Sequence, residues 1–302
     1  MLTPWIKNLM ISSAIIAAMT VSPAAILTTA RGDWLETAGS RVALPQMVKL
    51  RPGTFRYRVN GEFTRAARPA MAPLKTIWME HPPTVMKHQV TAADYRRCVE
   101  SGACSAPESD DAAANLPVTG VSWRDAQAYA SWLSRETGLA FRLPTDEEWA
   151  FAAAGRVRDD ALAQSAYDGD PGQRLLAKYD QGKSRAETTD RVPKPIGTFG
   201  ANENELLDVA GNVWEWTDTC FERSSIDERD ATKPATLNCG VRIAAGRHRA
   251  YVPDFIRDAN AGGCSLGKPP SNLGIRLVHD DGPRSWLRSY FSWYEGLTQR
   301  RG

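Results

Sequence analysis

The stretch Asp208-Val-Ala-Gly-Asn-Val-Trp-Glu-Trp-Thr-Asp218 carries the clearest structural signal in this sequence. A glycine and an asparagine near its middle are residues that tolerate positive φ, and a Trp-Glu-Trp triplet follows them. In an extended segment, alternation places Trp214 and Trp216 on one face and Glu215 on the other. One interpretation is therefore a turn that leads into a strand with an aromatic core face.

The same stretch also fits a calcium loop. Calcium binds about six to eight oxygens, often a mixture of carboxylates and carbonyls. Asp208 and Glu215 offer carboxylates, and the backbone carbonyls of Gly211 and Val213 can turn toward the same point. From these residues alone both interpretations stay open.

Four segments, in this order along the chain, resemble the signature segments of the formylglycine-generating enzyme family, also called the sulfatase-modifying-factor family. They are Pro117-Val-Thr-Gly-Val-Ser-Trp123, Arg142-Leu-Pro-Thr145 with Trp149, Gly211-Asn-Val-Trp-Glu-Trp216 and Asn272-Leu-Gly-Ile-Arg276. The resemblance covers residues 45 to 279. It implies an α+β, irregular C-type-lectin-like fold with few short helices and short antiparallel strands. It also implies a structural calcium ion on Asp208, Gly211, Val213 and Glu215.

The two ends of the chain differ from its middle. The run Leu9–Val21 is uncharged, largely apolar and of about signal-peptide length, and small residues follow it. It is short for a membrane span, which needs about 20 apolar residues. We expect a signal peptide or N-terminal anchor at 1–30, a linker at 31–44, one domain at 45–280 and an amphipathic tail at 281–302.

Five cysteines are typical of an oxidising compartment. Cys98 and Cys104 enclose a short loop, and Cys220 and Cys239 flank a polar one. Exported relatives in the resembled family carry cysteines in both arrangements, so we expect these two disulfides, although other pairings stay open. Cys264 is then left unpaired by these two disulfides. From the cysteines and the apolar run near the N-terminus we expect a periplasmic or otherwise exported protein.

Three helix starts are predicted by a hydroxyl residue followed three positions later by an acid, the pattern of a capping box. The pairs are Thr91–Asp94, Ser122–Asp125 and Thr145–Glu148. A short strand is predicted at 141–143. Arg142 and Glu148 are either surface charges or a buried pair. Residues 65–75 and 156–192 show little periodicity and are predicted to be loops.

The resemblance also says where redox chemistry would lie. In formylglycine-generating enzymes proper, two cysteines before the Asn-Leu-Gly-Phe-Arg segment bind copper(I), for which thiolates are suitable ligands. The corresponding segment here, Arg242–Asp258, contains no cysteine, and the expected pair falls near His248 and Pro253. We therefore expect no true copper-dependent formylglycine generation. The sequence identifies no other redox metal.

That segment and the unpaired cysteine still supply reactive side chains. A histidine can act as a general base, and arginines can bind a carboxylate or phosphate. Each of them is also a common structural residue, in a salt bridge or a hydrogen bond. The catalytic candidates are His248, Arg249, Tyr251 and Cys264, and the substrate-binding candidates are Arg247, Arg257 and Asp254.

Composition limits the partners. A formal net charge of +2, without a basic run carrying interleaved aromatics, gives no case for nucleic acid. Membrane contact is expected only through an uncleaved N-terminal segment. The chain resembles the exported branch of the family, which includes a protein needed for pyoverdine maturation and accessory proteins of copper nitrite reductases. We expect an oxidative maturation or accessory factor acting on a periplasmic peptide or protein. The alternative is a non-catalytic binding module, for example for a periplasmic reductase.

Overall fold

A computed structural model of the chain describes residues 42–66, 68–108, 112–157, 192–226, 235–258, 263–264 and 272–279. The chain divides into a unit of residues 1–41 and a unit Val42–Gly302, and all described residues lie in the second. The predicted leader, most of the linker and the predicted tail fall outside the described residues, as does most of the 156–192 loop. No helix among the described residues has the length and apolar character to cross a membrane.

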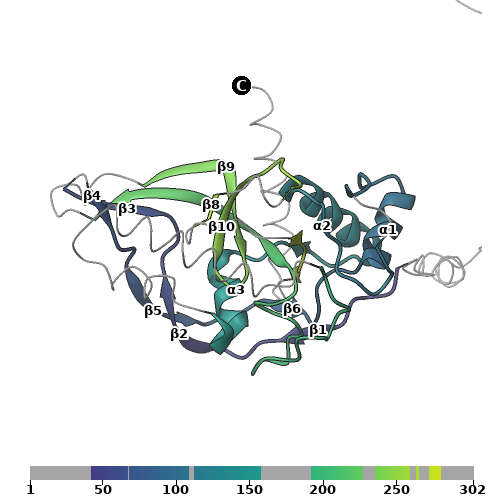
Figure 1. The fold of residues 1–302 in the computed structure, drawn as a ribbon. Helices are drawn as coiled ribbons and strands as arrows, with labels where there is room; N and C mark the ends of the chain where they lie inside the picture. The colour runs from purple at the N-terminus through teal and green to yellow at the C-terminus, as the bar shows by residue number, and fades with distance from the viewer. Residues whose placement is uncertain are drawn as a thin grey trace, which may run out of the picture. The chain divides into compact units, whose positions relative to one another are not determined.

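The principal sheet is built around the signature strand β8 (Trp214–Ser225), which pairs in antiparallel fashion with β9 (Thr236–Ala245). Its strand order is β11-β10-β9-β8-β3-β4, and β12 is paired to β8 in parallel (Figure 1). The bounds of the other strands are Glu62–Arg65 for β3, Arg68–Ala70 for β4, Arg249–Pro253 for β10, Gly263–Cys264 for β11 and Leu273–Gly274 for β12.

A second sheet has the order β1-β6-β13-β7, and a separate two-stranded ribbon pairs β2 with β5. The bounds are Met47–Lys49 for β1, Thr84–Met86 for β6, Val278–His279 for β13, Phe141–Arg142 for β7, Gly53–Arg58 for β2 and Leu74–Met79 for β5. With three short helices between the strands, the fold is α+β and irregular, as predicted. Strands β8 and β9, at 12 and 10 residues, are longer than the short strands expected.

The prediction of a loop over residues 65–75 is wrong, because this stretch contains β4 and the beginning of β5. Proline usually argues against a strand because it has no N–H to donate to the ladder. Pro69 nevertheless lies in β4, an edge strand of the principal sheet, where one side needs no partner. Edge position, which the sequence does not show, removes the objection.

The three predicted helices are α1 (Ala92–Glu100), α2 (Trp123–Thr137) and α3 (Asp146–Ala153). Each begins with the predicted capping box, in which hydroxyl and carboxylate both bind backbone N–H groups. Helix α2 ends at Gly138, whose φ of 73° lies in the left-handed region that glycine adopts most easily. A short 3₁₀ turn, η1 (Ala154–Arg156), follows α3.

The two predicted disulfides are present. Cys98–Cys104 joins the end of α1 to the segment that follows it. Cys220–Cys239 joins β8 to β9 close to an irregularity in the register between them. The core between α1, α2 and the principal sheet is rich in aromatic rings, and Tyr129 contacts both Tyr95 and Trp132.

Candidate functional site

The signature stretch forms a tight turn and then enters β8, which confirms the interpretation of a turn leading into a strand. Asp208, Ala210 and Asn212 adopt φ values of 60°, 57° and 61°. At Gly211 a Cβ atom would lie 3.3 Å from a ring carbon of Phe199, so a larger residue would require this ring to shift slightly. The turn therefore combines left-handed backbone with close packing.

Glu215 is the centre of a buried polar cluster and is fully inaccessible to solvent. Arg276 donates to both carboxylate oxygens, from Nη2 to Oε1 and from Nε to Oε2, each at 2.9 Å. Trp149 Nε1 donates to Oε2 at 2.7 Å, and Gln89 Nε2 donates to Oε1 at 2.7 Å. Three of the resembled segments thus meet at one carboxylate.

Asp208 is also buried, and it closes the turn. Its carboxylate accepts hydrogen bonds from the backbone N–H of Gly197 and, at 2.7 Å, from that of Phe199. The carboxylate therefore fixes the segment that enters the turn.

The four predicted calcium ligands already have donors within the protein. The carbonyls of Gly211 and Val213 face Gln89 Nε2, and Asp208 and Glu215 are bonded as described. A carboxylate has about four lone-pair positions, and Glu215 uses four in hydrogen bonds. In this arrangement the residues do not fit a calcium ion, and calcium stays a prediction from the sequence. Among the residues that the structure describes, no group of three or more His, Cys, Asp or Glu side chains is placed to hold a metal.

The predicted catalytic candidate Arg249 lies in β10 and pairs with Asp146 at the start of α3. Its Nε lies 2.9 Å from Asp146 Oδ2, and its Nη2 donates to the Arg58 carbonyl at 2.8 Å. Tyr57 donates to the same carboxylate at 2.7 Å. Burial, and then the Asp146 charge, raise the pKa of Tyr57. This cluster ties β2, α3 and β10 together.

Two predicted substrate-binding residues brace the beginning of α2. Arg257 binds both oxygens of Asp125, each at 2.8 Å. Asp254 accepts from Arg124 Nε at 3.1 Å and from Nη2 at 3.0 Å. Both interactions hold the segment after β10 against α2, and neither excludes a further role in binding.

The remaining candidates lie in the β9–β10 turn, in β10 and in β11. Arg247 is exposed in that turn. The His248 ring packs 5.3 Å from the Trp214 ring, and its Nδ1 lies 3.1 Å from the Arg249 carbonyl. The Tyr251 hydroxyl accepts from Gly61 N–H at 3.3 Å. The backbone of Cys264 pairs with β10 opposite Ala250, and its side chain lies outside the description.

The undecided pair Arg142 and Glu148 is a partly buried ion pair with side chains 22% and 15% exposed. Its two contacts measure 2.7 and 2.8 Å. Because Glu148 also accepts from the Thr145 N–H, the pair joins β7 to the first turn of α3.

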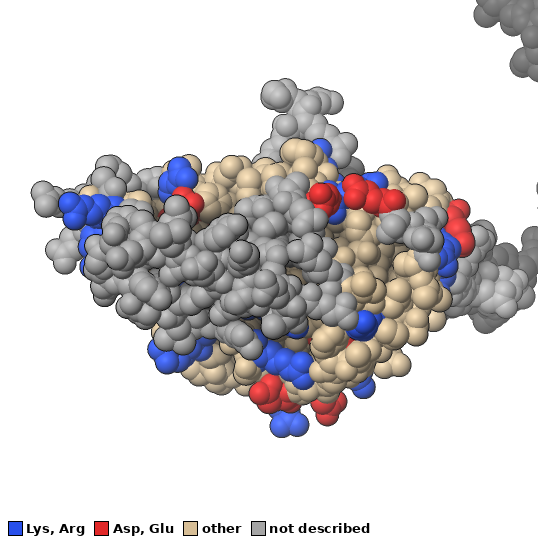
Figure 2. Space-filling view, in the orientation of Figure 1, with Lys and Arg blue, Asp and Glu red and all other residues tan. Residues whose placement is uncertain are grey.

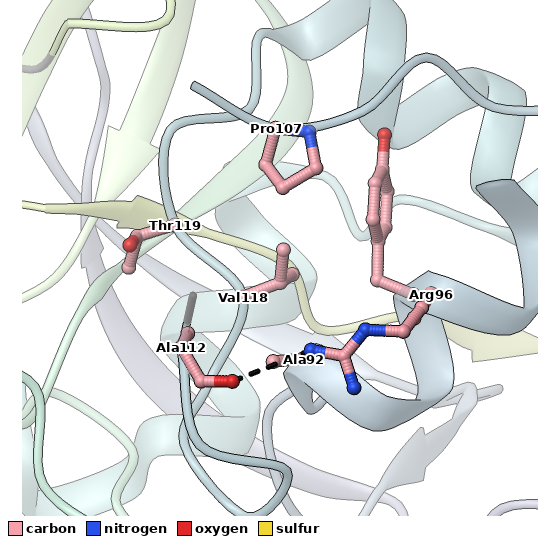
Figure 3. A pocket seen from close by; sticks show the side chains of 7 residues that line it. Ala92, Arg96, Pro107, Ala112, Val118 and Thr119 are labelled. Carbon is pink, nitrogen blue, oxygen red and sulfur yellow. Dashed lines mark hydrogen bonds between the residues drawn. The ribbon is translucent and has the colours of Figure 1, made fainter. Parts of the chain in front are cut away.

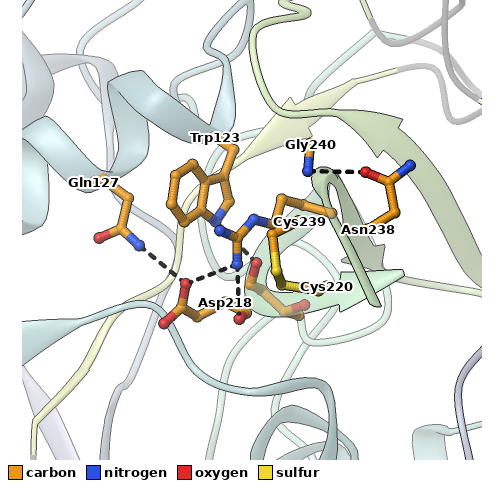
Figure 4. Close-up of a disulfide and its surroundings, with 9 residues drawn as sticks. Trp123, Gln127, Asp218, Cys220, Asn238, Cys239 and Gly240 are labelled. Atoms are coloured by element: carbon orange, nitrogen blue, oxygen red, sulfur yellow. Dashed lines mark hydrogen bonds and ion pairs between the residues drawn. A yellow bond between two sulfur atoms is a disulfide. The ribbon is translucent and has the colours of Figure 1, made fainter. Parts of the chain in front are cut away.

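A cluster that the sequence did not single out lies beside the Cys220–Cys239 disulfide (Figure 4). The Arg242 guanidinium stacks over the Trp123 ring, with its central carbon 3.9 Å from the ring centroid. Asp218 receives Arg242 Nη1 at 3.3 Å and Gln127 Nε2 at 3.2 Å. Burial raises the pKa of Asp218 and lowers that of Arg242.

One signal could have indicated this cluster in advance. Asp218 closes the signature stretch, and Arg242 opens the segment in which redox chemistry was expected. We call the surface formed by Trp123, Arg124, Asp218, Arg242, Asp254 and Phe255 the α2–β10 face. Phe255 is 60% exposed, and Arg124 lies 6.0 Å from the centre of its ring.

A small hollow lies between α1 and residues 112–119 (Figure 3). The space inside it that water can enter is only about 10 Å³, and its lining includes Tyr95, Pro107 and Val118. Substrate pockets usually enclose roughly 300–1,000 Å³ and contain several convergent polar groups. Arg96, its charged lining residue, donates to the Ala112 carbonyl, so the hollow does not form a second candidate site.

The fold and the buried centre define an irregular α+β domain organised around a tryptophan-rich signature strand. Residues 35–281 match the family described as the sulfatase-modifying factor enzyme 1-like domain, and the chain therefore belongs to this family.

The relatives of this chain include both an active and an inactive enzyme. The chain is 33% identical over 181 residues to the formylglycine-generating enzyme of Streptomyces coelicolor, covering 55% of this chain and 53% of that one. It is 30% identical over 169 residues to the inactive C-alpha-formylglycine-generating enzyme 2 of Bos taurus, covering 52% and 53%. The chain thus spans about half the length of these curated relatives. Among solved structures, PvdO from Pseudomonas aeruginosa is similar at 18% identity and a TM-score of 0.49, over 78% of this chain and 94% of that one.

Proposed function

We propose that this chain is an exported binding or accessory module that recognises a peptide or protein partner through the α2–β10 face. It uses the family fold without copper-dependent formylglycine generation. The observation that carries the proposal is that the segment where the redox site was expected has no thiol ligands and has charged side chains that pair within the protein. Residues 242–258 contain no cysteine, and Arg249, Asp254 and Arg257 each form an intramolecular ion pair.

The α2–β10 face has the composition of a protein-binding surface. Aromatic residues and arginines are enriched in the centres of protein interfaces. Here Phe255 and the Arg124 side chain are exposed, at 60% and 64%, and Trp123 and Arg242 are stacked beside them. The charges of this face are paired, Arg124 with Asp254 and Arg242 with Asp218. Where side chains are visible in Figure 2, acidic and basic ones also lie close to one another. This mixture favours a protein or peptide over a polyanion.

Two further observations support the proposal. A relative that matches about half of this chain is named as an inactive enzyme, which supports a use of the family fold without the activity. Two disulfides suit an oxidising compartment, which agrees with an exported protein.

An oxidative maturation factor is the second candidate function. It is favoured by the position of Cys264, whose backbone pairs with β10 at Ala250, between two predicted catalytic residues. Cys264 lies in β11 and is the one cysteine outside the two disulfides, so redox chemistry at a thiol would have to start from it.

The proposal is tested by site-specific photo-crosslinking in the full-length chain. A photoreactive phenylalanine analogue replaces Phe255 on the α2–β10 face or Trp78 on β5, two aromatic residues that are both 60% exposed. We expect one discrete covalent adduct from position 255 and none from position 78. Equal labelling at both positions, or labelling at position 78 alone, would exclude the face as the binding surface.

A matched pair of arginine variants sharpens the test. Arg124 and Arg223 have the same exposed side-chain fraction, 64%, and each pairs with one carboxylate. Arg124→Ala should reduce the adduct at position 255 several-fold, whereas Arg223→Ala should leave it unchanged. An adduct that persists in Arg124→Ala would contradict the proposed role of this arginine.

A further inference from the structure

The Gln89 amide occupies the point at which the predicted calcium ligands converge. Its Nε2 lies 2.7 Å from Glu215 Oε1, 3.3 Å from the Gly211 carbonyl and 3.4 Å from the Val213 carbonyl. Gln89 is fully buried. One NH₂ group therefore contacts three of the four oxygens that the sequence assigned to calcium.

The charge of Glu215 is already balanced. Arg276 and Glu215 are 1% and 0% exposed and form a bidentate pair, so the guanidinium neutralises the carboxylate. With Trp149 and Gln89 as further donors, Glu215 has no lone-pair position left for a cation. A divalent ion bound to Glu215 would lie close to the buried Arg276 guanidinium and would have to displace hydrogen bonds that the carboxylate already accepts, which is unfavourable.

We propose that the Gln89 amide nitrogen takes the place of the cation and makes the signature turn independent of calcium. The partly positive NH₂ hydrogens supply to Gly211, Val213 and Glu215 the electrostatic attraction that an ion would supply. This disagrees with the calcium site that the family resemblance implies, and it does not depend on the proposed binding function.

The backbone around Gln89 holds the amide in position. Its neighbour Val90 donates to the Ile275 carbonyl at 2.8 Å and accepts from Val118 N–H at 2.9 Å. These bonds connect the residue to two other signature segments. The side chain therefore enters the cluster from a fixed point.

The oxygen of the Gln89 amide helps to show why the NH₂ group faces the cluster. Gln89 Oε1 is buried and has no hydrogen-bond partner within the described residues. Turning the amide over would place this oxygen against three other oxygens, and the donor would be lost. The contacts of Nε2 outweigh the unsatisfied oxygen, because a buried oxygen cluster without a donor or cation is more costly.

The test compares thermal unfolding of the full chain in chelator and in calcium, for wild type, Gln89→Glu and Gln46→Glu. Gln89→Glu puts a carboxylate among the oxygens and removes the NH₂ group. Gln46→Glu makes the same charge change at an exposed position. We expect wild type and Gln46→Glu to have the same Tm in both conditions. We expect Gln89→Glu to have a lower Tm in chelator and to recover with calcium.

The change in Tm that calcium binding would cause can be estimated. A calcium concentration 100 times the Kd would raise the Tm of a domain of this size by about 5–10 °C. Such a rise in wild type would overturn the proposal and establish the calcium site. A Gln89→Glu variant as stable in chelator as wild type would also overturn it. If Gln89→Glu does not fold, the wild-type comparison alone still decides.

Discussion

At the scale of single residues, a buried ion pair is expected to have a large effect on the stability of the domain. Glu215 and Arg276 are 61 positions apart and are almost completely removed from water. Removing one member of such a pair leaves an uncompensated buried charge. The pair therefore makes the domain intolerant of substitution at either position.

Arg276→Met should destabilise the domain by about 3–5 kcal/mol, because it leaves the Glu215 charge buried without its cation. The control is Arg223→Met, which removes an ion pair with Glu62 whose side chains are 64% and 58% exposed. The control should cost about 0–1 kcal/mol. Urea unfolding followed by tryptophan fluorescence measures both. Equal losses would show that the buried pair has no special weight.

Asp218 gives a prediction on pH. Burial raises the pKa of its carboxyl group in the folded state, and this outweighs the opposing effect of Arg242. The folded state therefore binds this proton more tightly than the unfolded state, and the contribution of Asp218 to stability falls as pH rises above the ordinary aspartate pKa.

Asp218→Asn should remove that decline. The free energy of unfolding of the variant should rise relative to wild type as the pH rises through and above the ordinary aspartate pKa, by a modest amount because the side chain is 36% exposed. Urea unfolding at several pH values measures the difference. A difference that stays constant or changes in the opposite direction with pH would refute the assignment.

The same scale shows what a sequence does not reveal about a site. The sequence shows Arg249 and Arg257 in the expected redox segment, but it does not show their partners Asp146 and Asp125, which lie 103 and 132 positions away. A residue type indicates possible chemistry, whereas the partner determines whether that chemistry is available. Their predicted functional roles stay predictions.

At the scale of elements, local rules predicted the helices well. All three helix starts follow from a hydroxyl residue and an acid three positions later, a signal contained within four residues. The edge strand β4 was missed because its proline is acceptable only at a sheet edge, and edges are set by distant segments.

The first turn of helix α2 contains an acid that caps the helix and also forms an ion pair. Asp125 accepts from Ser122 N–H and Oγ at 2.8 and 2.7 Å and also binds Arg257. Asp125→Ala should cost about 2–3 kcal/mol, because it removes a cap and a partly buried ion pair together. Asp94→Ala, at the same position of α1, should cost about 1 kcal/mol. Thermal or urea unfolding compares them, and an equal cost would mean that Arg257 adds nothing.

At the scale of the whole molecule, the signature segments contact one another in the interior of the domain. Trp149, Glu215 and Arg276 come from three of them and meet at one carboxylate. The fourth contributes the Val121 carbonyl, which accepts from Trp216 Nε1 at 2.9 Å. The segments could be recognised in the sequence, but their meeting point, and the presence of Gln89 there, depend on the tertiary fold.

Buried tyrosines predict the alkaline limit of the domain. Burial raises the pKa values of Tyr57, Tyr95 and Tyr129 above the usual value. The unfolded chain ionises these groups above about pH 10 while the folded domain keeps them protonated, so stability is lost as pH rises past that point. Tyrosinate absorbance should show them ionising together with loss of the circular-dichroism signal. Ionisation of all tyrosines near pH 10 in a folded protein would contradict this.

The proposed function as a binding or accessory module requires that this family member works without a redox metal. The most direct test is the metal content of the full-length protein for wild type, His248→Ala and Cys264→Ser, measured by mass spectrometry. We expect copper and iron far below one equivalent in all three proteins. About one equivalent of either metal in wild type, lost in one of the variants, would show a redox centre on other ligands and would contradict the proposed function.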